Sequence, residues 1–167
     1  ATWSGLDQLP LTFTPNRGQW PDSVSFRASA GGVAVWLTST GALYQFTRRI
    51  ETKTDTIVDM GSSLPAPDPR LVAHKGEMLE YQIIRARFEG SNPSVHLAGE
   101  TPLRSTCNYM LGSDLSRWHV DIPNYGAVIY RGVYPGVDLR YYGNGGRVEY
   151  DFIVSPGADH RMIRISM

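Results

Sequence analysis

The chain has 167 residues, 41% of them hydrophobic and 19% charged, which is enough to bury a core as one domain. Its 16 basic residues balance its 16 acidic ones, so no net field attracts nucleic acid or an anionic membrane. With 17 glycines and 11 prolines, the composition favours turns over long helices and predicts an all-β domain.

The first part of the chain shows short strand patterns separated by turns. Apolar alternation and β-branched residues predict strands at 9–13, 24–28, 33–38 and 42–48. In the third strand Val33, Val35 and Leu37 share a face, which leaves Trp36 on the opposite face as an anchor of a second layer or an exposed aromatic.

Residues 54–76 interrupt this pattern with glycines, serines and alternating prolines, which cannot join the interior of a sheet. We expect a variable loop there within a single domain spanning 1–167, because each flank alone is too small to bury a convincing core.

Strand patterns resume at 78–88, 95–98, 103–110 and 127–130, with Gly99 and Pro102 as breaks. Residues 114–118 predict one short helical turn capped by Ser113 or Asp114. An alternating run at 162–167 stops with the chain, which predicts an edge strand and a fragment of a longer protein. About ten short strands predict an antiparallel β-sandwich or flattened barrel.

Residues 133–154 predict a β-hairpin, because Gly143, Asn144, Gly145 and Gly146 supply the positive φ angles of a tight turn. A turn centred on Asn144 and Gly145 places Asp138 opposite Asp151. This like-charged pair requires an arginine neighbour, a bound cation or a different register. One hairpin face is then apolar, with Leu139, Tyr141, Val148, Tyr150 and Phe152, and the other is polar, with Asp138, Arg140, Tyr142, Arg147, Glu149 and Asp151.

The carboxylates Asp138, Glu149 and Asp151 form the main candidate for chemistry. Glu149 and Asp151 lie two residues apart on one strand, ~6.5–7 Å between Cα atoms, a separation that a glycosidase acid and base can use. A calcium ion would need further oxygens from Asn144 and backbone carbonyls. Arg140 and Arg147 beside the carboxylates favour an ion-pair network instead. We therefore expect no catalytic residue and no cofactor, with calcium as the alternative.

Aromatic side chains suggest a second kind of site. Trp118, in a polar loop, and Tyr142, on the polar hairpin face, predict an exposed pair, and Trp36 is a third candidate. Such rings can stack on a sugar, although most aromatic residues are expected in the core.

The segment Asn16–Trp20 predicts a structural loop after the first strand. Arg17 is expected to join two loops or a hairpin carboxylate through its guanidinium. Asn16 is expected in a left-handed conformation, followed by Gly18.

Four segments together resemble the N-terminal domain of a family of bacterial exported proteins. They are NRGQW at 16–20, NYMLG at 108–112, VYPGVDLRYYGN at 133–144 and VEYDFIVSPGAD at 148–159. In that family the domain precedes β-propeller-type (SBBP) repeats or other extracellular modules. The resemblance implies an extracellular or cell-surface β-rich module of uncharacterised role, and it carries no catalytic residues over.

The sequence thus predicts a non-enzymatic structural or interaction module of a multidomain surface or secreted protein, in its mature form without a signal peptide. A carbohydrate-binding module is the alternative, and a glycosidase-like domain using Glu149 and Asp151 is the second. The expected partners are other domains of the same longer chain, or a glycan. Nucleic acid and a membrane span are not expected, and the final strand predicts an edge-to-edge dimer.

Overall fold

The computed structural model describes residues 11–30, 32–51 and 77–167. Within these ranges the regular structure consists of ten strands and two 3-10 turns, which confirms the all-β prediction. The strands are β1 Phe13–Pro15, β2 Phe26–Ala30, β3 Val33–Thr38, β4 Gly41–Glu51, β5 Glu77–Phe88, β6 His96–Met110, β7 Trp118–Tyr134, β8 Val137–Asn144, β9 Arg147–Val154 and β10 Ile165–Ser166. The predicted loop at 54–76 and the start of the predicted strand at 9–13 lie outside the described residues.

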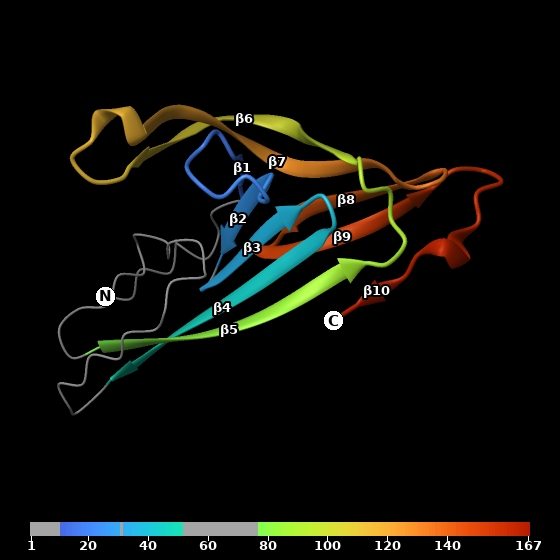
Figure 1. Ribbon diagram of the computed structural model, residues 1–167, viewed down its shortest axis with the longest axis horizontal. Helices are drawn as coiled ribbons and strands as arrows, with labels where there is room; N and C mark the ends of the chain where they lie inside the picture. The colour runs from blue at the N-terminus through green and yellow to red at the C-terminus, as the bar shows by residue number, and fades with distance from the viewer. Residues whose placement is uncertain (1–10, 31, 52–76) are drawn as a thin grey trace.

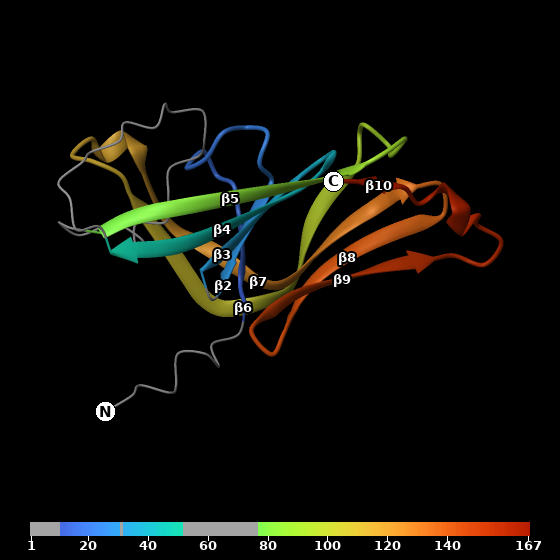
Figure 2. The same ribbon diagram turned by 90° about the horizontal axis from the view of Figure 1, so that it is seen from below.

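The strands form one antiparallel sheet that curls into a half-barrel (Figures 1 and 2). Its order is β10-β5-β4-β3-β2-β1-β7-β8-β9, and β6 pairs with β7. The curl places β4 and β5 on one wall of a concave face and β8 and β9 on the other (Figure 2). None of the described helical segments is long and apolar enough to cross a membrane.

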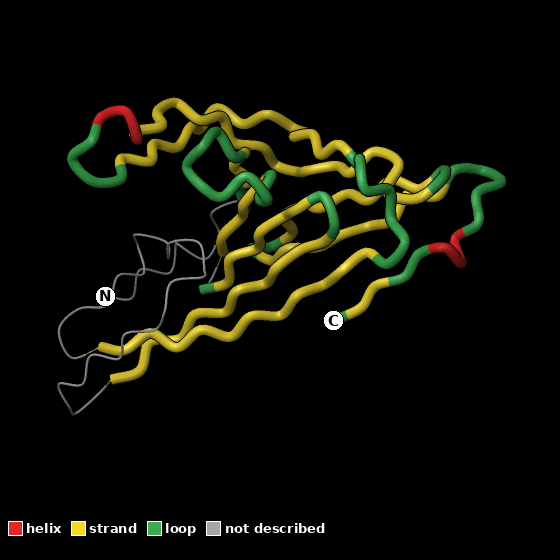
Figure 3. Tube along the Cα trace, in the orientation of Figure 1, coloured by secondary structure: helices red, strands yellow, loops and turns green. Residues whose placement is uncertain are grey.

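Two 3-10 turns punctuate the sheet (Figure 3). The turn η3, Leu115–Arg117, lies at the far end of the β6–β7 hairpin and is capped by Asp114, as the sequence predicts. The turn η4, His160–Met162, was not predicted. It shortens the expected strand at 162–167 to Ile165–Ser166, which pairs with β5.

The strand β6 corrects the prediction of two strands at 95–98 and 103–110. It runs through Gly99 and Pro102, and its pairing with β7 shifts register between Pro102 and Thr106. Thr101, just before this shift, takes a φ of 55°. A Cβ at Gly99 would lie 2.5 Å from ring carbons of Tyr125, so the glycine lets that ring lie against the backbone of β6. Tyr125 marks the point where β7 changes its neighbour from β1 to β8.

Apolar side chains are buried on both faces of the sheet. The concave face holds the main core, whose largest fully buried side chains are Tyr130, Tyr134, Tyr141, Phe13, Leu37 and Leu139. On the opposite face of β3, Trp36 packs with Val24 and Ala34 under Trp20. Trp36 is therefore the anchor of a second layer and not an exposed aromatic.

The β8–β9 hairpin has the predicted faces but a different register. Its turn is Gly145 and Gly146, with φ angles of 55° and 77°, and Asn144 faces Arg147. The predicted register is therefore wrong by two residues. Arg140 faces Asp151 and Asp138 faces Ile153, so the like-charged pair does not exist. A shift of two residues exchanges partners but keeps every side chain on its face.

Candidate functional site

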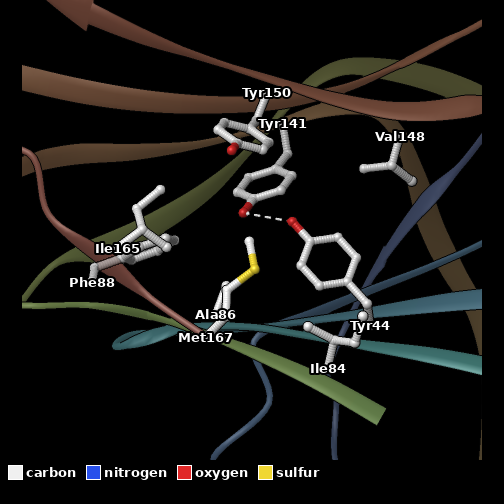
Figure 4. Close-up of a pocket in the computed structure, with 9 residues that line it drawn as sticks. All are labelled: Tyr44, Ile84, Ala86, Phe88, Tyr141, Val148, Tyr150, Ile165 and Met167. Atoms are coloured by element: carbon white, nitrogen blue, oxygen red, sulfur yellow. Dashed lines mark hydrogen bonds between the residues drawn. The ribbon is translucent and has the colours of Figure 1, made fainter. Parts of the chain in front are cut away.

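An apolar groove of about 260 Å³ opens on the concave face between the two walls of the half-barrel (Figure 4). Strands β4 and β5 supply one wall, β8 and β9 supply the other, and the C-terminal segment reaches into it (Figure 4). The lining residues are Tyr44, Ile84, Ala86 and Phe88 on the first wall, Tyr141, Val148 and Tyr150 on the second, and Ile165 and Met167 from the C-terminal segment.

The two tyrosines Tyr44 and Tyr141 meet across the groove. Their hydroxyl oxygens are 3.2 Å apart and share a hydrogen bond (Figure 4). Burial raises the pKa of both side chains, most strongly that of Tyr141, so both hydroxyls are neutral at ordinary pH. The groove therefore offers uncharged rings and aliphatic side chains, which favours an apolar ligand over an ion.

One border of the groove is the edge of β5 that faces away from β4. Strand β4 pairs with β5 along its whole length, whereas β10 pairs only with Phe88 and Arg87. The Phe88 N–H donates to Thr40 O on the β4 side, and the Glu89 N–H donates to Arg164 O on the β10 side. Successive residues of the strand direct their N–H and C=O groups to opposite sides, so residues with odd numbers share the side of Glu89. The backbone groups of Tyr81, Ile83 and Arg85 therefore point away from β4. No described strand pairs with them.

The other border is the outer edge of β9, which pairs with β8 alone among the described strands. The Ser155 N–H donates to Gly136 O on the β8 side. The same alternation directs the backbone groups of Val148, Tyr150 and Phe152 outward. Tyr150 also keeps 42% of its surface exposed. Among the described residues, the groove is therefore bordered by two stretches of strand backbone that pair with no further strand.

The C-terminal segment is held beside the groove by Tyr134. Its hydroxyl donates to Arg164 O at 2.9 Å and accepts from the Arg164 N–H at 3.3 Å. This contact places Ile165 opposite Phe88 and Ser166 opposite Arg87. Met167 lines the groove but remains 87% exposed.

The predicted carboxylates lie on the convex face, away from the groove. Asp138 accepts hydrogen bonds from the Arg131 guanidinium at 3.1 Å and from the Gly132 N–H at 2.7 Å. Glu100 joins Arg131 to Arg140, with both contacts at 3.0 Å. The partner of Asp138 is thus Arg131, and neither Arg140 nor Arg147 takes that place.

Glu149 and Asp151 have polar partners on the same face, and Tyr142 interacts with both carboxylates. Glu149 accepts from Asn144 Nδ2 at 3.1 Å. A hydrogen bond with Asp151 raises the pKa of Tyr142, whose ring also lies 5.3 Å from the Arg140 guanidinium. Arg147 is exposed beside the turn. Among the described residues no group of three or more His, Cys, Asp or Glu side chains is arranged to hold a metal ion.

The predicted aromatic platform is not assembled. Trp36 is only 3% exposed, with the Arg27 guanidinium 4.7 Å from its ring. Trp118 is 38% exposed and faces Met110, whereas Tyr142 faces Ala127. Positions 118 and 127 are nine residues apart on β7, or ~30 Å along an extended strand. The predicted pair of Trp118 and Tyr142 is therefore wrong.

The loop after β1 is organised by Asn16 and not by Arg17. The Asn16 side-chain amide donates to the carbonyls of Trp20, Pro21 and Val24 at 3.1, 2.9 and 2.9 Å. Asn16 is not among the residues with positive φ, whereas Gly18 has a φ of 106°. Arg17 is exposed, and its backbone N–H donates to Gln19 Oε1. The side chain that holds this loop together is therefore Asn16 and not Arg17.

Sequence reasoning did not identify the groove, although a signal was present. Ile84 and Ala86 alternate with arginines on β5, and Val148 and Tyr150 alternate with charged residues on β9. This alternation marks an apolar face but not whether another layer covers it. Whether another layer covers that face depends on how strands far apart in the sequence pair.

The curled antiparallel sheet with an apolar groove on its concave face makes this chain a β half-barrel domain. Residues 13–167 match the family model described as a domain of unknown function, DUF7948. The chain belongs to that family. No curated protein and no solved structure matches it.

Proposed function

We propose that this domain is a non-enzymatic interaction module that binds a polypeptide in its concave groove. The observation that carries the proposal is the position of the groove between the outer edges of β5 and β9, which pair with no described strand at Tyr81–Arg85 and Val148–Phe152. Apolar lining residues supply binding energy by excluding water, and the edges supply backbone donors and acceptors. A polypeptide satisfies both requirements.

The placement of the polar residues favours this role over the two alternatives from the sequence. Glu149 and Asp151 lie on the convex face with Asn144 and Tyr142 as partners, so they do not line the groove. Trp36 is buried, and Trp118 is far from Tyr142 along the sheet. The groove itself is lined by neutral side chains.

The proposal also includes an extracellular or cell-surface setting. Its support is the resemblance of four segments to the N-terminal domain of bacterial exported proteins with SBBP repeats. In that setting the bound polypeptide is another domain of the same long chain or a neighbouring surface protein.

Site-specific photo-crosslinking in cells that make the whole protein tests this function. A photoreactive residue replaces Ile84 in the groove, and a matched protein carries it at exposed Ser94, in the β5–β6 loop, which is not among the residues that line the groove. We expect polypeptide adducts from position 84 and few from position 94, identified by mass spectrometry. Equal labelling from both positions, or no polypeptide adduct from position 84, would contradict the proposal.

A further inference from the structure

We infer that the far end of the β6–β7 hairpin binds the surface of a zwitterionic lipid bilayer, with its apolar side chains among the headgroups. Four exposed apolar residues lie there and form what we call the tip patch: Met110, Leu115, Trp118 and Val120. None of them lines the groove, so this role is separate from the polypeptide binding proposed there.

The tip patch lies on a part of the hairpin that is a ribbon of two strands. Before it reaches β1, β7 pairs with β6 alone among the described strands. One face of this ribbon packs on the loop after β1, where the ring centre of Tyr109 lies 5.2 Å from that of Trp20. Met110 and Trp118 face each other on the opposite face, and Val120 follows two residues along β7. This second face is turned away from the loop, which leaves its apolar side chains exposed.

The size of the tip patch favours a lipid surface over a second copy of the chain. Its four residues are between 38% and 67% exposed and together show on the order of 400 Å² to solvent. Each side of a standard protein interface buries roughly 800 Å². A lipid surface sets no such minimum, because binding strengthens with every apolar side chain that enters it. Tryptophan is also common at the boundary between lipid and water.

Internal hydrogen bonds allow this end of the hairpin to enter a layer that is poor in water. The Trp118 indole N–H donates to Gly112 O at 3.0 Å. In the turn η3, the Ser116 N–H and hydroxyl both donate to the Asp114 carboxylate, at 3.0 and 2.7 Å. The Arg117 N–H donates to Asp114 O at 3.1 Å. Burying a polar group is costly mainly when it has no partner, and these groups keep their partners inside the hairpin.

The charges beside the tip patch match a headgroup that carries both signs. Asp114 precedes Leu115 and Arg117 ends the turn η3, and both charged residues are exposed. The hydrogen bonds from Ser116 lower the pKa of Asp114, so its carboxylate is charged at neutral pH. A phosphatidylcholine headgroup offers an ammonium group to this carboxylate and a phosphate to Arg117. Because the chain has 16 basic and 16 acidic residues, no net charge selects anionic lipid instead.

Flotation of the whole protein with phosphatidylcholine vesicles tests this binding. We expect Leu115→Asp to lower the partition coefficient more than about tenfold, and uncharged Leu115→Asn about threefold or more, because both remove an apolar contact. The matched control is Met162→Asp, which makes the same change of charge at an exposed apolar residue of η4, at the opposite end of the molecule (Figures 2 and 3). It should change binding less than about twofold.

Quenching of fluorescence by brominated phosphatidylcholine identifies the tryptophan that meets the lipid. Trp118→Phe keeps an aromatic ring and should retain most of the binding, but it should remove most of the quenching. Trp20→Phe is the control, because Trp20 packs against Tyr109 on the other face of the ribbon. It should leave the quenching in place.

Several outcomes would overturn the inference. The first two are no flotation at millimolar lipid and equal losses in Leu115→Asp and Met162→Asp. Binding only to anionic vesicles, abolished by salt, would mean general charge attraction and not contact through the tip patch. Self-association in sedimentation that Leu115→Asp abolishes would assign the tip patch to a second copy. A photoreactive residue at position 115 that gives protein adducts in cells, and no lipid adducts, would assign it to a protein partner.

Discussion

The hydroxyl of Tyr134 is predicted to hold the C-terminal strand onto β5, and Tyr134→Phe removes this hydroxyl while keeping the buried ring. Two hydrogen bonds to Arg164 are lost, one at 2.9 Å and one at 3.3 Å. At ~0.5–1.5 kcal/mol each, and with exposed Arg164 partly rehydrated, we expect a loss of about 1–2 kcal/mol. Local opening of the segment should then become roughly 5- to 30-fold more frequent.

The Glu89 amide reports this opening, because it donates to Arg164 O at 2.9 Å. Native-state hydrogen exchange should show faster exchange at Glu89 in the variant. The control is the Ser155 amide, which donates to Gly136 O away from the segment and should keep its rate. An unchanged rate at Glu89, or equal acceleration at both amides, would refute the role assigned to Tyr134. The former means that the hydroxyl does not hold the segment, and the latter means that the variant destabilises the whole domain.

Three further predictions concern stability. Burial raises the pKa of Tyr130 and Tyr141 above the ordinary value of 10.0, so both stay protonated in the folded state. Their contribution to the free energy of unfolding is fully present below about pH 10 and falls above it by ~1.4 kcal/mol per pH unit for each tyrosine. Urea unfolding from pH 9 to 11 measures this fall, and Tyr141→Phe should remove the part due to one tyrosine. An unchanged dependence of the unfolding free energy on pH would argue against this assignment. Asn16→Ala removes the amide contacts with the carbonyls of Trp20, Pro21 and Val24 and the acceptor for the Gly18 and Trp20 N–H groups, and it should cost ~2–3 kcal/mol in urea unfolding. A loss below ~0.5 kcal/mol would contradict its central role. Gly99→Ala places a methyl group against the Tyr125 ring and should cost ~1–3 kcal/mol, which Tyr125→Ala should largely relieve in a double-mutant cycle; simple additivity would exclude the clash.

The faces of the β8–β9 hairpin could be predicted from the sequence, but its register could not. Alternation with a period of two assigns Leu139 and Tyr141 to the core in either register, because a shift of two residues leaves every face unchanged. Both Asn144–Gly145 and Gly145–Gly146 can form the turn with positive φ angles. A contact outside the hairpin is consistent with the observed choice, since a Cβ at Gly143 would lie 2.6 Å from Leu11 Cβ. Residues far away in the chain therefore contact the hairpin next to its turn.

The partner of Asp138 was hidden for the same reason. Inside the hairpin the only cations are Arg140 and Arg147, so the sequence offered them as its neighbours. The actual partner, Arg131, lies on β7. The spacing of residues along a hairpin predicts which side chains face each other within it. It does not predict which side chains a third strand, here β7, brings next to them.

The groove could not be predicted from the sequence, because the residues that line it alternate with polar residues in the same way as residues of a buried core. Ile84 and Ala86 alternate with Ile83 and Arg85 in the same way whether the edge of β5 is open or paired. The strand order decides the difference: β7 passes from β1 to β8, and this turns β8 and β9 back toward β4 and β5 without pairing them directly. Two walls that face each other without a shared ladder leave both an apolar surface and free backbone groups between them.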